Sequence, residues 1–67
     1  MNPKQYLSTY MYDGERWWSI VKGSAAGCAA SKDRDKIIGI YRQKFPGADM
    51  PVWNGDIGKF VTLEEIP

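Results

Sequence analysis

Few side chains of this 67-residue chain could take part in catalysis. Histidine, the most frequent general base at neutral pH, is absent, so the single cysteine, Cys28, has no imidazole to activate its thiol. A zinc site of the usual Cys/His kind cannot form for the same reason. Because its neighbours are alanine and glycine, we expect Cys28 to be a small packing residue.

The paired carboxylates have structural explanations. Asp33 and Asp35 lie in the first turns of a predicted helix, where acidic side chains complement the helix dipole, and Glu64 and Glu65 stand close to the end of the chain. The triplet Gly-Ile-Tyr at 39–41 matches one half of a nuclease signature, but the second half is missing. No glycine-rich phosphate loop is present. We therefore predict a non-enzymatic protein with no cofactor and no metal.

Composition and length indicate one small globular domain, residues 1–67. Hydrophobic residues make up 43% and charged residues 25% of the chain, as in ordinary globular proteins. Apolar runs are only a few residues long, which excludes a membrane-spanning helix. The first ten residues lack the apolar stretch of a signal peptide, so a cytoplasmic location is expected.

The net charge of +1 conceals an asymmetry along the chain. Residues 31–45 carry five basic and two acidic side chains, whereas residues 47–67 carry one basic and four acidic side chains. These segments are either solvated surfaces that keep the protein soluble, or regions that pair with each other or with a partner.

The strongest structural signal is a β-hairpin. Residues 5–12 and 15–22 are rich in β-forming residues, and Asp13-Gly14 between them favours a type I′ turn. A two-residue turn would pair Tyr12 with Glu15, Tyr10 with Trp17, Ser8 with Ser19 and Tyr6 with Val21. A four-residue turn would keep both strands but change these partners.

Alternation along the two strands separates their side chains into two faces. Leu7, Met11, Trp18 and Ile20 form the predicted core side, which also carries Arg16. Tyr6, Tyr10, Tyr12 and Trp17 fall on the opposite side. An antiparallel sheet can expose one face to water, but that face is then normally polar. These aromatic side chains therefore need an explanation.

The next segments predict a helix between two less regular regions. Residues 23–30 are small, and they form either a loop or a third strand. A helix is expected to start at Ser31 as its cap and to end at Pro46-Gly47. Its apolar stripe consists of Ile37, Ile38, Tyr41 and Phe45, with Gly39 on the outer face.

The C-terminal third predicts a second hairpin. Asn54-Gly55 is a second type I′ signal, between a short strand at 51–53 and a longer one at 57–63. The predicted fold is therefore an α+β domain, in which one helix packs on one face of a four-stranded antiparallel sheet. The second face of that sheet would be uncovered.

An uncovered aromatic face predicts a binding protein. Tyrosine and tryptophan are enriched at interface hot spots because each combines a large rigid surface with a polar atom. We expect Tyr6, Tyr10, Tyr12 and Trp17 to contact a protein partner, with Arg16 and Lys22 at the rim. A homodimer seam, or cross-strand pairing that only stabilises the hairpin, would explain the same residues. Single-stranded nucleic acid is a less favoured ligand, because the isoelectric point is only about 7.8.

Residues 10–45 contain a further pattern: Asp-Gly-Glu-Arg-Trp-Trp in the hairpin, Ala-Gly-Cys at 26–28, and an amphipathic helix after Ser31. This pattern resembles the N-terminal domain of HicB-type antitoxins, although Ala26 stands where that family has proline. The resemblance implies a protein that binds and blocks a small toxin. In size and architecture the chain is also similar to small phage-encoded accessory proteins, including inhibitors of host defence.

Overall fold

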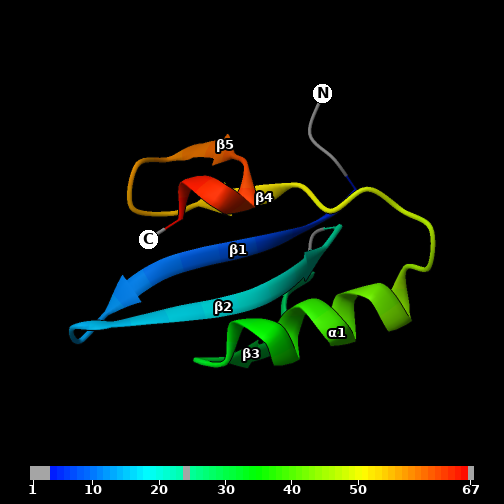
Figure 1. The fold of residues 1–67 in the computed structure, drawn as a ribbon, viewed down its shortest axis with the longest axis horizontal. Helices are drawn as coiled ribbons and strands as arrows, with labels where there is room; N and C mark the ends of the chain where they lie inside the picture. Colours follow the sequence, from blue (N-terminus) through cyan, green and yellow to red (C-terminus); the bar gives the residue numbers. More distant parts are fainter. Residues whose placement is uncertain (1–3, 24, 67) are drawn as a thin grey trace.

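The protein folds as an α+β domain built on one five-stranded sheet (Figure 1). The structure is a computed structural model that describes residues 4–23 and 25–66, and only the backbone of residues 25–28. Its elements are β1 (Gln5–Tyr12), β2 (Glu15–Lys22), β3 (Ala25–Ser31), α1 (Arg34–Lys44), β4 (Val52–Asn54), β5 (Lys59–Val61) and the short 3₁₀ helix η1 (Leu63–Glu65).

The sheet differs from the predicted one in strand number and direction. Its strand order is β3-β2-β1-β4-β5. β4 runs parallel to β1, while the other neighbouring pairs are antiparallel, so the sheet is mixed. The prediction of four antiparallel strands was wrong because it treated the two hairpins as separate units. The chain instead returns after α1 beside the free edge of β1.

The first hairpin forms as predicted. All four predicted pairs are present: Tyr12 with Glu15, Tyr10 with Trp17, Ser8 with Ser19 and Tyr6 with Val21. Asp13 and Gly14 both have positive φ, at 53° and 78°, as a type I′ turn requires. The two-residue turn is therefore confirmed over the four-residue alternative.

Residues 25–31 form a strand, which answers the question left open by their sequence. β3 pairs antiparallel with β2, with a register shift between Ile20 and Lys22. Small residues without alternation give little strand signal, so pairing with the backbone edge of β2 defines this element. The expected packing role of the Cys28 side chain lies outside the described residues.

Helix α1 is capped differently from the prediction. Asp33 is the N-cap, and its Oδ1 accepts a hydrogen bond from the Lys36 N–H at 3.2 Å. Ser31 accepts one from the Asp33 N–H at 3.0 Å and so shapes the approach to the helix. The assignment of the cap to Ser31 was therefore wrong, while the helix ends at Lys44, just before Pro46, as expected.

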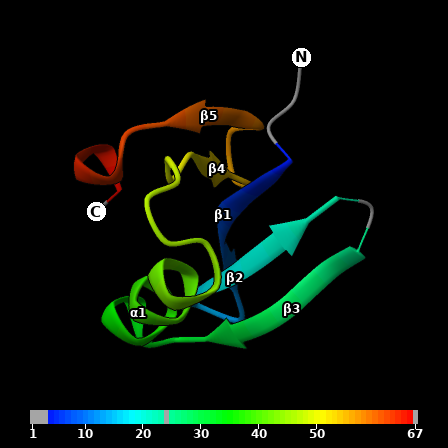
Figure 2. The same cartoon turned by 90° about the vertical axis from the view of Figure 1, so that its right-hand side faces the viewer.

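The core lies between the sheet and the elements on one side of it. α1 lies over β2 and β3, and η1 lies on the same side near β4 and β5 (Figure 2). The buried apolar residues are Leu7, Trp18, Ile20, Ile37, Tyr41, Val52 and Ile66. Met11 shares this side but lies near the hairpin tip with 48% of its surface exposed, so its assignment to the core was wrong.

A capping box at η1 holds the last described residue, Ile66, against this core. The Glu65 carboxylate accepts hydrogen bonds from the Thr62 N–H and hydroxyl at 2.6 and 3.1 Å. Both bonds lower the pKa of the Glu65 carboxyl, and the bond from the Thr62 backbone N–H has the larger effect.

The second turn is not a type I′ turn. Gly55 is not among the residues with positive φ, and the four-residue loop 55–58 connects β4 to β5. The Asn54 Oδ1 accepts the Asp56 N–H at 2.9 Å, and the Asn54 carbonyl accepts the N–H of Gly58, whose φ is 70°. The Asn54 side chain thus organises a longer loop, and the predicted strand 57–63 shortens to β5.

Candidate functional site

The four sequence-predicted aromatic residues lie together on the side of the sheet away from α1. Tyr6, Tyr10 and Tyr12 alternate along β1 with the buried Leu7 and Thr9, and Trp17 precedes the buried Trp18 on β2. The register of β4 and β5 adds Trp53 and Phe60 to this side. We call these six residues, Tyr6, Tyr10, Tyr12, Trp17, Trp53 and Phe60, the open face.

Three rings of the open face form a cluster across β1, β4 and β5. The Phe60 ring centroid lies 5.3 Å from that of Tyr6 and 5.0 Å from that of Trp53, with interplanar angles of 84° and 75°. These edge-to-face contacts are favourable aromatic geometries. The cluster therefore contributes to the stability of the second hairpin, yet 37% of the Phe60 surface remains exposed.

The other three rings surround a depression near the tip of the first hairpin. This depression has a volume of about 250 Å³ and is lined by Tyr10, Tyr12, Trp17 and Ala30. Tyr12 exposes 67% of its surface. The Trp17 indole N–H is buried, and it finds no hydrogen-bond acceptor within the described part of the chain. An apolar hollow lined by aromatic side chains is a favourable place for a ligand to bind.

One ion pair borders this depression. The Lys32 Nζ lies 3.3 Å from both carboxylate oxygens of Glu15 and 5.8 Å from the centroid of the Trp17 ring. Sequence reasoning missed this pair because Lys32 reaches the open face only once β3 joins the sheet. At this edge of the open face, the two charges therefore neutralise each other.

Arg16 and Lys22 do not lie at the rim of the open face. Alternation places both on the helix side of β2, opposite Trp17. The Lys22 Nζ lies 5.9 Å from the centroid of Phe45 at the end of α1. The register therefore does not support their predicted place at the rim, and their contact with a partner stays a prediction.

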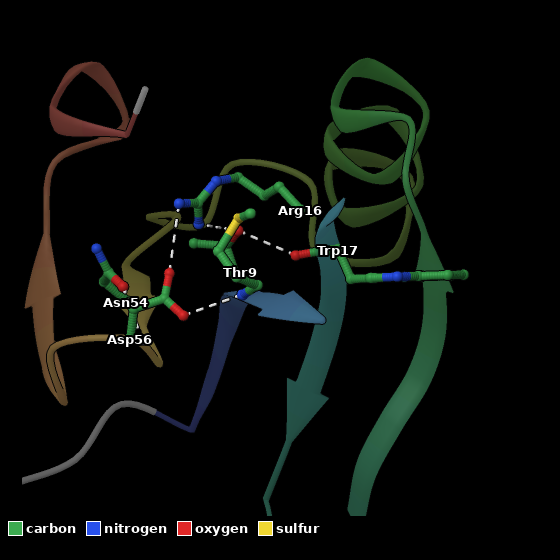
Figure 3. Close-up of polar contacts among 6 residues, drawn as sticks. Thr9, Arg16, Trp17, Asn54 and Asp56 are labelled. Atoms are coloured by element: carbon green, nitrogen blue, oxygen red, sulfur yellow. Dashed lines mark hydrogen bonds and ion pairs between the residues drawn. The ribbon is translucent and has the colours of Figure 1, made fainter. Parts of the chain in front are cut away.

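Arg16 instead joins the first hairpin to the loop 55–58 (Figure 3). Its guanidinium donates to Thr9 Oγ1 at 3.1 Å and pairs with Asp56 Oδ2 at 3.3 Å. The other carboxylate oxygen of Asp56 accepts the Met11 N–H at 3.0 Å, and the Thr9 hydroxyl donates to the Trp17 carbonyl at 3.0 Å. In the same view, the Trp17 indole extends the other way, over β3. This network fixes the backbone beneath the open face.

We expect Asp56→Asn to lower the free energy of unfolding by about 1 kcal/mol, because an amide oxygen keeps the Met11 contact but loses the ion pair with Arg16. The two paired side chains are only 19% and 33% exposed, so solvent screens them incompletely. Urea unfolding measures the change. The matched control is Glu15→Gln, which removes an ion pair of the same length with Lys32, 3.3 Å, between side chains that are 54% and 53% exposed. Equal effects of the two substitutions would contradict the role given to Asp56.

The other polar residues singled out in the sequence serve the fold. Asp33 caps α1, Glu65 closes the capping box, and Tyr41 of the Gly-Ile-Tyr triplet is 1% exposed in the core. Among the described side chains, those of residues 4–23 and 29–66, no group of three or more metal-binding residues comes together. No helix described by the structure has the length and apolarity needed to cross a membrane.

The fold and the open face define a small α+β domain in which no helix or strand described by the structure covers one side of the sheet. Comparison of the chain with protein-family models, with curated proteins and with solved structures finds no match. Function is therefore inferred from the residues of the open face.

Proposed function

We propose that this protein acts by stoichiometric binding of a protein partner through the open face, as an inhibitor or antitoxin-like protein in the cytoplasm, and not as an enzyme. The observation that carries the proposal is the gathering of six aromatic side chains on the uncovered side of the sheet. Water-facing sheet surfaces are normally polar. Partly exposed tyrosine and tryptophan are the residue types that contribute most energy in protein interfaces.

Single-stranded nucleic acid is the second candidate, because bases stack on exposed aromatic rings. The charge distribution disfavours it. Binding of phosphates requires cations beside the rings, but Arg16 and Lys22 lie on the helix side. Lys32 does border the open face, where it is paired with Glu15. The aromatic residues are thus better placed for a neutral protein surface than for a polyanion.

A pull-down from bacterial lysate, with and without nuclease, tests the proposal. We expect one protein to be retained in near-equal amount irrespective of nuclease, and to be lost with the double substitution Tyr10→Ala and Trp17→Ala. The matched control replaces two exposed apolar residues outside the open face, Met11→Ala and Ile57→Ala, which are 48% and 57% exposed. Because this control leaves the open face intact, it should retain the partner.

Three results would count against the proposal. Nuclease-sensitive recovery of many proteins would favour the nucleic-acid function. Equal loss of the partner in the control would place the contact elsewhere on the protein. Retention of no protein by the folded wild type would remove the support for a binding role.

A further inference from the structure

We propose that two copies of this chain pack open face against open face, forming a reversible, two-fold symmetric dimer when no other partner is present. The proposal uses the same surface as the proposed function but does not depend on it. It rests on the area of the open face, on its charge, on the arrangement of its rings and on the size of the domain.

The area of the sheet suits a weak dimer. Three strands of seven or eight residues and two of three residues, with about 3.3 Å per residue and about 4.8 Å between strands, give a projected sheet face of roughly 450 Å² per copy. Two such faces bury at most roughly 900 Å² together, below the roughly 1,000 Å² of specific interfaces and in the range of weak, transient contacts. A dimer of this size is expected to dissociate readily, so that a tighter partner can displace the second copy.

The charge of the open face permits a second copy to approach. Beside Trp17, the acidic Glu15 and the basic Lys32 already neutralise each other at 3.3 Å. Arg16 and Lys22 lie on the far side of the sheet. Two identical faces can therefore meet without the repulsion between like charges that opposes most self-association.

The rings are arranged so that two copies complement each other. Tyr10, Tyr12 and Trp17 lie on β1 and β2 toward the hairpin tip, whereas Tyr6, Trp53 and Phe60 lie on β1, β4 and β5 toward the opposite corner. Ser8, near the centre of the sheet, separates the two sets. Consider a two-fold axis that lies in the interface and runs diagonally across the sheet near Ser8. The rings at the hairpin tip of one copy then contact the rings at the opposite corner of the second copy. The two sheets then cross at about 90°, one of the two angles preferred by packed sheets.

The size of the domain favours such a dimer. A chain of 67 residues gains limited stability from one core, and small domains commonly add disulfides, a metal or oligomerisation. One cysteine cannot form an internal disulfide, and the residues described by the structure contain no metal-binding cluster. Burial of the open face by a second copy supplies the missing apolar contact.

Sedimentation velocity from micromolar to millimolar protein tests the proposal. We expect the wild-type mass to rise from that of a monomer to that of a dimer, and the thermal midpoint to rise with concentration. Tyr12→Lys places a charge on the open face at a 67% exposed position. It should weaken self-association by about thirtyfold or more, the loss typical of a hot-spot residue.

The matched control is Met11→Lys, which adds the same charge at the neighbouring, 48% exposed residue on the helix side. It should dimerise like the wild type. Phe60→Lys is a second open-face variant if circular dichroism shows that Tyr12→Lys is unfolded.

A wild type that remains monomeric at millimolar concentration overturns the dimer, as does equal weakening by Met11→Lys and Tyr12→Lys. Neither result affects the proposed function, because only the pull-down tests it. A dimer that captures no other protein would conversely support this inference and remove the proposed function.

Discussion

We expect Trp18→Ala to unfold the protein, whereas Trp17→Ala, one residue away, leaves a cooperative thermal melt. Trp18 is 3% exposed and belongs to the core cluster with Leu7 and Ile37. Removing a buried tryptophan costs about 3–5 kcal/mol through lost burial and the cavity left behind. A single core in a domain of this size supplies about the same amount, roughly 3–5 kcal/mol. The substitution therefore removes most or all of the stability.

Trp17 differs because it faces the other side of the same strand. Its side chain is half-buried, and its indole N–H has no acceptor among the described residues, so its removal leaves no hydrogen-bond partner unpaired. We expect Trp17→Ala to cost about 1 kcal/mol, as for the loss of cross-strand aromatic contacts. Urea and thermal unfolding followed by circular dichroism compare the two variants.

The outcome bears directly on the proposed function. If Trp17→Ala also abolished the cooperative transition, the open face would act as a second core and would not be free to bind a partner. If Trp18→Ala remained folded with near-normal stability, the assignment of the two faces would itself be wrong.

The parts of the fold that could be predicted are those fixed by neighbouring residues. Asp13-Gly14 selects a two-residue turn, and that turn together with alternation determines every pair between β1 and β2. The helix position follows from its apolar stripe, with Ile37 and Tyr41 buried as predicted. In each case the signal and the structure lie within a few residues of one another.

The remaining parts depend on contacts distant in sequence. β4 pairs with β1 through Leu7 and Val52, which are separated by α1 and have no local signal that specifies a parallel pair. The same pairing carries Trp53 to the open face, and Phe60 follows with β5. Alternation within 52–54 and 59–61 separates the two faces of each short strand. It does not say which of these faces lies on the same side of the sheet as Tyr6, because that depends on the pairing of β4 with β1.

The second of the largest effects is expected at Tyr41. Tyr41→Phe should lower the free energy of unfolding by about 1–1.5 kcal/mol at neutral pH, because it removes the hydroxyl that bonds to main-chain carbonyls of two distant segments. The Tyr41 hydroxyl donates to the Asp49 carbonyl at 2.7 Å and lies 3.4 Å from the Gln5 carbonyl. It thus joins the helix to the start of β1 and to the segment that leads into β4. The Tyr41 side chain is 1% exposed, although Asp49 itself lies on the surface.

The same residue predicts a dependence on alkaline pH. Burial, reinforced by the charge of Asp49 and partly offset by the Gln5 contact, raises the pKa of Tyr41 above its usual 10.0. The folded state then holds the phenolic proton more tightly than the unfolded state does. The stability linked to this group is complete below pH 10 and is lost as the pH rises above that value toward the raised pKa of the folded state.

Urea unfolding at neutral pH and above pH 10 measures both effects. Tyr41→Phe should be less stable than the wild type at neutral pH but should lose less of its stability at alkaline pH, so the two profiles converge. Tyr12→Phe is the matched control, because the Tyr12 ring is 67% exposed on the open face, and it should follow the wild-type profile throughout. Parallel profiles for Tyr41→Phe and the wild type would show that Tyr41 is not the buried group that couples folding to pH.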